Sequence, residues 1–356
     1  MSETLPCNPV DVAARLLAWY AESGRDLPWR GTRDPYRVWL SEIMLQQTTV
    51  AAVIPYYERF LEAFPDIESL AAAPVETVIE LWAGLGYYRR ARNLHAAAKQ
   101  VVEDYGGRFP DTPEAILALP GIGRSTAGAI LSIAFDRPAP VLDGNVRRVL
   151  CRLFALREPP RSRSAEKKLW CWAEMLTPPD RPHDYAQAIM DLGATVCVPG
   201  QPLCDACPLA GICRGYALGL AHLLPVRQQT RKVPTIRRVV LAVQNEDRLL
   251  VRRRPLDGML AGLWELPEAE LMDDETADQA ARRLAQSFGA HNPQRVGQVR
   301  HAYSHFRLEL ELWRATTDPS FRVGEGESRW VPISAIDETP LHGAHKKAFK
   351  LLDSTS

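Results

Sequence analysis

The chain has 356 residues, of which 46% are hydrophobic, and its 43 basic side chains balance 43 acidic ones. This length and composition predict a globular protein of two or more domains and exclude a disordered or fibrous one. A net charge of zero excludes attraction of nucleic acid by total charge, so any such surface must be local. The chain lacks an apolar run of membrane-spanning length and a signal-peptide pattern. We therefore expect a monomer in the cytoplasm, associated with the nucleoid if the protein is bacterial, and no membrane partner.

Residues 8–216 have a helical pattern, because apolar residues recur every three or four positions and proline or glycine interrupts them at intervals. The clearest helices are predicted within residues 75–88 and 112–135. At the end of the first range, Tyr87 and Tyr88 adjoin the arginines of residues 89–92. This mixture of basic and aromatic side chains is suited to contacting DNA phosphates and to wedging between bases.

An earlier helix is predicted to begin at Asp34 and Pro35, and its next turns are apolar on almost every side. Glu42 lies inside this helix. A carboxylate buried among apolar side chains is costly, and desolvation should raise its pKa so that it holds a proton near neutral pH. An ion pair with Arg30 or Arg37 is the alternative explanation for an acid at this position.

Two glycines, Gly121 and Gly123, flank one apolar residue between two predicted helices in residues 119–130. They permit a tight turn and bring backbone N–H groups at the start of the second helix close to an anion. Such a hairpin can hold a DNA phosphate without reading sequence. Taken alone, the motif is explained equally well as a simple turn between helices.

Asp143 precedes another predicted helix, in the segment VLDGNVRRVLCRLF. The free N–H groups of a helix start favour the ionised form of an aspartate, although a plain helix cap is the simpler explanation of this residue alone. Together with Glu42 it supplies the two groups that cleavage of a glycosidic bond requires. One acid protonates the leaving group, and one anion stabilises the positively charged sugar.

Four of the seven cysteines, Cys197, Cys204, Cys207 and Cys213, are separated by six, two and five residues. Four-thiolate loops of this kind hold either zinc or an iron–sulfur cluster. Structural zinc usually prefers two close CxxC pairs, whereas only Cys204 and Cys207 form one here, so the spacing favours an iron–sulfur cluster. A disulfide framework is not expected, because the number of cysteines is odd and the chain is too long to need one.

Residues 221–234 are polar, basic and contain prolines, which is typical of a linker between domains. After this segment the hydrophobic pattern changes from a helical period to strict alternation. A hairpin is predicted to turn at residues 245–247, and residues 306–313 alternate between apolar and charged side chains. One helix is predicted within residues 275–289, so residues 235–356 should form a smaller α+β domain.

The hairpin of residues 119–130, followed by a C-x6-C-x2-C-x5-C loop, resembles the helix-hairpin-helix DNA glycosylase superfamily, specifically its endonuclease III and MutY branches. The resemblance covers roughly the first 220 residues. It implies an all-α, bilobal glycosylase domain over residues 1–220 that carries a [4Fe–4S] cluster on the four cysteines of the loop. It also implies excision of a base that is flipped out of double-stranded DNA.

Further motifs of the MutY branch imply roles for single residues. The segment LSEIMLQQT matches the motif that carries the catalytic glutamate, Glu42, and LDGN matches the one that carries the catalytic aspartate, Asp143, with Asn145 assisting it. Gln187 aligns with an adenine-contacting position, Gln47 and Tyr87 with residues that wedge into the opened duplex, and Trp29 and Arg30 with residues near the adenine pocket.

Bifunctional relatives in this superfamily carry a lysine at the position of Ser125. That amine forms a Schiff base with the sugar before the strand is cut, and a serine cannot do this. The resemblance therefore implies a monofunctional enzyme that leaves an abasic site. Ser125 could also be only a helix residue bonded to its own backbone, and another lysine could supply some lyase activity.

Residues 248–268 of the second domain resemble the opening of a Nudix fold as found in MutY. A Nudix hydrolase needs a run of glutamates on a helix to bind Mg²⁺, and the corresponding helix lacks them, so this domain should recognise rather than hydrolyse. In the family a Phe-Ser-His loop probes the 8-oxoguanine opposite the adenine. Tyr303, Ser304 and His305 correspond to it, with tyrosine in place of phenylalanine.

These features predict a MutY-type adenine DNA glycosylase that removes adenine paired with 8-oxoguanine or guanine. The nearest alternative is an endonuclease III-like glycosylase and lyase that acts on damaged pyrimidines. Two alternatives from other classes are a catalytically inactive DNA-binding scaffold and a nucleotide pyrophosphatase. The intact Glu42 and Asp143 argue against the first, and the missing glutamate run argues against the second.

Overall fold

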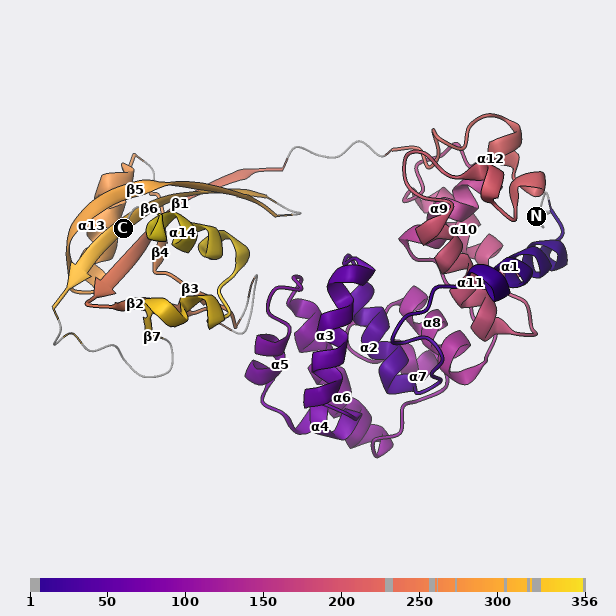
Figure 1. Cartoon of the computed structure of the whole chain (residues 1–356), viewed down its shortest axis with the longest axis horizontal. Coiled ribbons are helices and arrows are strands. Elements are labelled where there is room, and N and C mark those ends of the chain that lie inside the picture. The colour runs from indigo at the N-terminus through magenta and orange to yellow at the C-terminus, as the bar shows by residue number, and fades with distance from the viewer. Residues whose placement is uncertain are drawn as a thin grey trace. The chain divides into compact units, whose positions relative to one another are not determined.

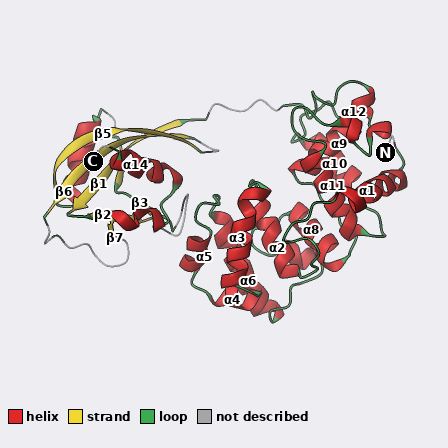
Figure 2. Ribbon diagram, viewed as in Figure 1, coloured by secondary structure: helices red, strands yellow, loops and turns green. Residues whose placement is uncertain are grey.

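The computed structural model describes residues 7–227, 233–255, 260, 262–272, 274–303, 306–318, 321 and 328–354. The chain divides into two compact units, residues 1–72 with 93–230 and residues 73–92 with 231–356. Among the described residues, every strand lies at position 235 or later, and the preceding part consists of helices and loops (Figure 1; Figure 2). The predicted fold class, an all-helical part followed by an α+β part, is confirmed. No helix in the described ranges is long and apolar enough to cross a membrane.

Eleven α-helices precede the cysteine loop within the described residues. They are α1 (Pro9–Ser23), α2 (Pro35–Leu45), α3 (Val50–Ala63), α4 (Ile67–Ala72), α5 (Val75–Leu81), α6 (Arg89–Tyr105), α7 (Pro113–Leu117), α8 (Arg124–Phe135), α9 (Gly144–Leu153), α10 (Arg163–Leu176) and α11 (Pro182–Thr195). The cysteine loop contains the 3-10 turns η1 (Cys204–Ala206) and η2 (Ala210–Ile212) and is followed by the short helix α12 (Arg214–Ala217).

Local sequence signals fix where the functional helices begin. The Asp34 side chain caps α2 by accepting a hydrogen bond from the Tyr36 N–H at 2.9 Å, and Pro35 occupies the first helical position. Asp143 caps α9 in the same way, accepting from the Val146 N–H at 2.7 Å. Both starts agree with the prediction, because a capping aspartate supplies an acceptor for an N–H group that the helix leaves free.

Four of these helices, α2, α8, α9 and α11, pack together. Helix α2 packs against α8, and α11 packs against both α8 and α9. Helix α8 is buried on almost all of its surface, including Ala129 and Ile130 at 0% exposure, so it forms the centre of this arrangement. A helix that is apolar all round belongs in the interior of the domain.

The C-terminal unit contains a seven-stranded sheet whose main order is β3-β2-β1-β6-β5, with β4 pairing to β1 and β7 to β2. The strands are β1 (Thr235–Asn245), β2 (Arg248–Arg253), β3 (Trp264–Glu265), β4 (Glu268–Glu270), β5 (Ala290–Ala302), β6 (Arg307–Thr317) and β7 (Ser328–Pro332). The helices are α13 (Ala277–Ser287) and α14 (Gly343–Asp353), with a 3-10 segment η3 (Ile333–Glu338) before α14.

Pairing of β1 with its neighbours confirms the predicted hairpin and adds one feature that the sequence did not predict. Asn245 pairs with Arg248 across a two-residue turn, as expected from residues 245–247. On its other side β1 runs parallel to β6, with Thr235 opposite Arg307. The centre of the sheet therefore joins segments that are far apart in the chain.

The sheet has a helix on each face, and the strands alternate between the two cores. Val240 and Ala242 of β1 pack with α14, whereas Val239 and Leu241 pack with α13. On β6 the predicted alternation is confirmed, since Leu310 and Leu312 have 0% exposure. Helix α13 begins at a capping box formed by Thr276 and Gln279.

Candidate functional site

A cavity of about 700 Å³ opens among α2, α8, α9 and α11. It collects most of the predicted site residues of the helical part, although they are far apart in the sequence. The predicted residues that line it are Trp29, Arg30, Glu42, Gln47, Ser125, Asp143, Asn145 and Gln187. A cavity of this volume is large enough for a nucleobase and its sugar, and polar groups converge on it from several elements.

Glu42 projects from the middle of α2 into this cavity. Burial, and secondarily the negative charge of Asp143, raise the pKa of Glu42 to about 7, while the charge of Arg30 opposes the shift. The predicted rise in the pKa thus follows from desolvation. The alternative ion pairs are formed elsewhere: Arg37 lies 3.5 Å from Asp34, and Arg30 pairs with Asp191.

Asp143 differs from the prediction in its electrostatics. Its cap on α9 is present, but burial raises its pKa above the ordinary value of an aspartate. Hydrogen bonds from Val146 and Asn145 and the charge of Arg148 act in the opposite direction and only reduce this shift. The N–H groups of the helix start favour the anion, as expected, but the loss of hydration outweighs them, so the net shift of the Asp143 pKa is upward.

Asn145 and Arg148 support Asp143 from the first turns of α9. The Asn145 side chain hydrogen-bonds to Asp143, and its Oδ1 accepts a bond from Arg148 Nη2 at 2.8 Å. Arg148 also donates to the Gly193 carbonyl at 2.5 Å and to the Cys197 carbonyl at 2.7 Å. Arg148 was not among the predicted site residues, and its place one helical turn after Asn145 is the signal that could have found it.

A buried carboxylate, Asp191, holds two arginines that line the cavity. Asp191 has 0% exposure and accepts hydrogen bonds from Arg25 at 2.5 Å and from Arg30 at 2.7 Å. Arg30 in turn donates to the amide oxygen of Gln187, whose nitrogen donates to the His183 carbonyl at 3.3 Å. The sequence interpretation missed Arg25 and Asp191, although Asp191 lies four residues after Gln187 on the same helix face.

Ser125 lies near the start of α8, on the same cavity. Its hydroxyl accepts a hydrogen bond from the Leu142 N–H at 3.1 Å, directly before Asp143 in the chain. The side chain therefore bonds to the segment that positions Asp143, and not to its own helix. A hydroxyl in this place cannot form a Schiff base.

Three aromatic or polar residues predicted near the duplex have distinct surroundings. Trp29 is 5% exposed and packs edge-on against Tyr57, with ring centroids 5.3 Å apart. Gln47 and Tyr87 both have positive φ angles, 60° and 51°, and Tyr87 is 43% exposed. Residues held in this region of backbone space are strained and cluster at functional sites. Tyr87 does not line the cavity of Glu42.

The predicted basic and aromatic mixture around residue 90 is partly structural. Arg90 is buried at 8% exposure, and its guanidinium donates to the Gly86 carbonyl at 3.1 Å. It lies 5.2 Å from the Trp82 ring and 5.6 Å from the Tyr87 ring. Arg90 therefore packs the loop before α6, whereas Arg89 is exposed and available for contact with phosphate.

The helix-hairpin-helix motif joins α7 to α8, with Ile122 buried at 7% exposure. Gly121 has a φ of +80°, and a Cβ there would lie 2.7 Å from the Cβ of Asn93. Gly123 has an ordinary φ of −96° and caps α8, and a Cβ at this position would have open space around it. Only Gly121 is required by the turn itself.

The four predicted cysteines line one small cavity beside α9. Within the described residues, no three cysteine sulfurs come within 4.8 Å of one another. A single tetrahedral zinc ion needs sulfurs about 3.8 Å apart, since each bond is about 2.3 Å long. Arg152, which is 2% exposed, donates to Cys197 Sγ at 3.3 Å and to the Val198 carbonyl at 2.8 Å. The arrangement fits a group larger than one metal ion.

Known proteins share both parts of the chain. Residues 40–175 match the family of HhH-GPD superfamily base excision DNA repair proteins, and residues 238–351 match the NUDIX domain. The adenine DNA glycosylase of Mus musculus is 36% identical over 96% of this chain and 77% of the relative. The one of Homo sapiens is 37% identical over 94% of this chain and 73% of the relative. The chain belongs to the adenine DNA glycosylase family.

Membership of this family makes the chain a DNA glycosylase enzyme of base excision repair, and it gives no support to the pyrimidine-specific alternative. Among solved structures, a thermostable thymine-DNA glycosylase is 33% identical and covers 59% of this chain and 97% of its own, with a TM-score of 0.54. An endonuclease III–DNA complex covers 60% of this chain and 99% of its own at 22% identity, with a TM-score of 0.50, which supports the helical fold.

The C-terminal part of this glycosylase agrees with a Nudix-like scaffold whose helix α13 lacks the metal-binding glutamates. No glutamate is present in α13, and the three glutamates of β3 and β4 are paired with arginines: Glu265, Glu268 and Glu270. Tyr303 follows β5 directly and is partly buried. Two of the residues predicted to probe the lesion, Ser304 and His305, lie outside the described residues.

Proposed function

We propose that this glycosylase removes adenine mispaired with 8-oxoguanine or guanine from double-stranded DNA, by hydrolysing the N-glycosidic bond of a flipped nucleotide. The observation that carries the proposal is the pair of carboxyl groups at one cavity, with the pKa of Glu42 raised to about 7. The full-length relatives that share most of this chain are named adenine DNA glycosylases.

In this proposal Glu42 is the general acid. An adenine leaves deoxyribose readily once a ring nitrogen is protonated, and a carboxyl group with a pKa near 7 holds the required proton at neutral pH. Asp143, ionised and hydrogen-bonded by Asn145, stabilises the oxocarbenium-like sugar. Water then completes the hydrolysis, since Ser125 offers no amine for a covalent step, and the product is an abasic site.

The remaining predicted residues would bind the substrate. Arg30 bonds to both Gln187 and Asp191, and Arg30 and Gln187 would present donors and acceptors to the flipped adenine, with Trp29 packed beside it. Gln47 and Tyr87 would fill the space that the base leaves in the duplex, as strained and exposed residues can. Gly121 and Gly123 would present the N–H groups of the start of α8 to a DNA phosphate.

We also propose a [4Fe–4S] cluster on Cys197, Cys204, Cys207 and Cys213. The residues fit this group, because the four thiols face one cavity and are too far apart for one zinc ion, and Arg152 donates a hydrogen bond to Cys197. The cluster would serve as a structural crosslink, while Arg148 and Arg152 hold the loop against α9.

Each of the proposed domains would have its own role. Residues 1–220 would carry base excision, residues 221–234 would be the linker, and residues 235–356 would read the base opposite the adenine. The Tyr303, Ser304 and His305 segment would contact the 8-oxoguanine, through packing of the aromatic ring and hydrogen bonds to the N7–H and O8 of the lesion.

The test is a single-turnover glycosylase assay on four duplexes, with adenine opposite 8-oxoguanine, guanine, cytosine and thymine. We expect rapid release opposite 8-oxoguanine, slower release opposite guanine, and little opposite the others. Glu42→Gln should bind the first duplex as the wild type does but lose at least about a thousandfold in rate, because the proton donor is gone. Addition of borohydride during turnover should trap no covalent adduct.

Excision by Glu42→Gln at a rate near that of the wild type would remove Glu42 from the chemistry. A trapped adduct would show that a lysine forms a Schiff base and that the enzyme is bifunctional. Release of damaged pyrimidines without release of adenine would contradict the proposed substrate.

A further inference from the structure

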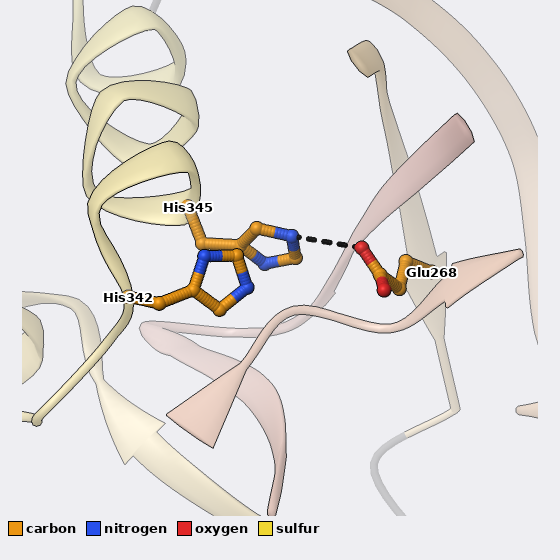
Figure 3. Close-up of side chains that lie close together, drawn as sticks. All are labelled: Glu268, His342 and His345. Atoms are coloured by element: carbon orange, nitrogen blue, oxygen red, sulfur yellow. Dashed lines mark hydrogen bonds and ion pairs between the residues drawn. The ribbon is translucent and has the colours of Figure 1, made fainter. Parts of the chain in front are cut away.

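One buried cluster of the C-terminal unit has the composition of a metal site. Ligand atoms of Glu268, His342 and His345 lie within 4.8 Å of one another, and Figure 3 shows the His345 ring directed at Glu268. The hydrogen bonds argue against a cation. His345 Nδ1 accepts from the Leu266 N–H at 2.8 Å, so Nε2 carries the ring proton and donates it to Glu268 Oε2 at 3.2 Å. Glu268 also pairs with Arg254 at 3.1 Å. The cluster therefore ties α14 to the sheet, and His345 keeps no free lone pair for a metal ion.

In the helical part, the first half of α8 packs closely along the segment that leads to Asp143. Ser125, in the first turn of α8, accepts its hydrogen bond from the Leu142 N–H at 3.1 Å. Three residues further along the helix, a Cβ on Gly128 would collide with the carbonyl oxygen of Pro140, so the two backbones approach closely there. These contacts fix the place of Asp143 relative to α8.

The residue after Ser125 makes a corresponding contact with α2. Thr126 is 9% exposed, and its Oγ1 accepts a hydrogen bond from Gln46 Nε2 at 3.2 Å. Gln46 is the C-cap of α2 and follows Glu42 by one helical turn, which places both side chains toward the same cavity. Because this bond joins the end of α2 to the start of α8, it restricts sliding of one helix along the other.

Helix α8 is therefore the common support of the two carboxyl groups, which come from different parts of the chain. Glu42 lies on α2, and Asp143 caps α9. In the proposed reaction the acid and the anion act on one nucleotide, so their separation must match the distance between the base and the sugar. A misplacement of about 1 Å between reacting groups can lower a rate on the order of a hundredfold.

We propose that Thr126 is a positioning residue for base excision, whose hydroxyl ties the end of α2 to α8 and so holds Glu42 at a fixed distance from Asp143. This inference rests on the proposed function. Thr126 and Ser125 would act together, one on the carrier of each carboxyl group. The same turn of α8 has the free N–H groups proposed to hold a DNA phosphate, so duplex binding and alignment of the two carboxyl groups would use one structural element.

The experiment measures single-turnover excision of adenine opposite 8-oxoguanine by the full-length enzyme between pH 5 and pH 9. Thr126→Val keeps the shape of the side chain and removes the hydrogen-bond acceptor, so we expect the maximum rate to fall about tenfold. The alkaline decline of the rate should also begin at lower pH, because a more distant Asp143 raises the pKa of Glu42 less. Thr126→Ser keeps the hydroxyl and should keep both values near those of the wild type.

The other partner of the bond provides a second variant. Gln46→Leu should have the same effects as Thr126→Val, and the double variant should lower the rate no further, because both changes remove one shared bond. The matched control is Thr177→Val, in which the lost hydroxyl bonds to the Ala173 carbonyl of its own helix, α10, at 2.8 Å. This control should leave the rate and its pH dependence unchanged.

An unchanged maximum rate and pH dependence in Thr126→Val would overturn the proposal, as would additive losses in the two single variants. An equal loss in Thr177→Val would also overturn it, since the rate would then follow general stability. If Glu42→Gln excises adenine as fast as the wild type, the proposed function fails and this inference fails with it. An inactive Glu42→Gln beside an unaffected Thr126→Val rejects the positioning role alone.

Discussion

Glu42 titrates within the physiological range, since burial and the neighbouring Asp143 raise its pKa from 4.5 to about 7. A general acid works only while it is protonated. We therefore expect the rate of base release to fall up to tenfold per pH unit above about pH 7, and to fall again in acid once Asp143 is protonated. A single-turnover rate profile between pH 5 and pH 9 measures this, and a rate that rises with pH across that range would contradict the assignment.

The same shift has a thermodynamic consequence with a defined sign. Between pH 4.5 and about 7 the folded state binds more protons at Glu42 than the unfolded state, so this residue costs stability as the pH rises through that window. Glu42→Gln should therefore raise the free energy of unfolding at pH 8 by on the order of 2 kcal/mol, and by much less at pH 5. Urea unfolding of both proteins at the two pH values provides the measurement.

The structural role of an individual residue could be predicted from sequence only where the signal for it lies within a few neighbouring residues. Asp34 and Asp143 were predicted as helix caps because the signal lies within a few residues. The partner of Arg30 could not be predicted in this way, since Asp191 lies on a helix more than a hundred residues away. The sign of the Asp143 pKa shift also depends on burial, which a capping motif does not report.

At the scale of elements, the hairpin between α7 and α8 offers a matched pair of variants. Gly121→Ala would place a Cβ 2.7 Å from the Cβ of Asn93 at a φ of +80°, so we expect a loss of about 1–3 kcal/mol in stability and weaker binding to any duplex. Gly123→Ala, with open space and an ordinary φ, should change stability by less than about 1 kcal/mol.

Denaturant unfolding and duplex binding at fixed salt measure both effects of the glycine variants. Equal losses of stability in Gly121→Ala and Gly123→Ala would mean that the turn does not depend on a left-handed backbone conformation at position 121. If a folded Gly121→Ala protein kept its affinity for the duplex, the hairpin would not be the site that contacts a DNA phosphate.

Helices and strands were predictable wherever the period of the hydrophobic residues and the positions of proline and glycine indicate the same element. The helical character of residues 8–216, the starts of α2 and α9, and the β1–β2 hairpin follow from these signals. The parallel pairing of β1 with β6 does not, because alternation identifies a strand without naming its neighbour. The cavity likewise requires the packing of α2, α8 and α11, which no single segment encodes.

At the scale of the whole molecule, we expect the cysteine loop to stabilise the C-terminal end of the helical part. Cys204→Ser should purify with less iron and sulfide and melt several degrees lower, because one of the four ligands of the proposed cluster is lost. Cys171→Ser, a half-buried thiol outside the loop, should keep both values near those of the wild type. Elemental analysis and thermal unfolding test this, and zinc in place of iron in the wild type would reject the cluster.

The succession of a helical part and a mixed part was predictable because the hydrophobic period changes after residue 234. Net charge gave no indication of a nucleic-acid substrate, since a total of zero does not exclude a local basic surface. Ser304 and His305 lie outside the described residues, so their predicted role stays a prediction.

The parallel pairing of β1 with β6 has a consequence for biosynthesis. When β1 leaves the ribosome, its parallel partner β6 is still about seventy residues from being translated. The helices before β1 have by then been synthesised. The nascent chain must therefore expose an apolar strand without its neighbour for several seconds, at ordinary elongation rates of about 5–20 residues per second. Destabilised variants of the second half should consequently be lost to aggregation or chaperone capture during synthesis rather than after release.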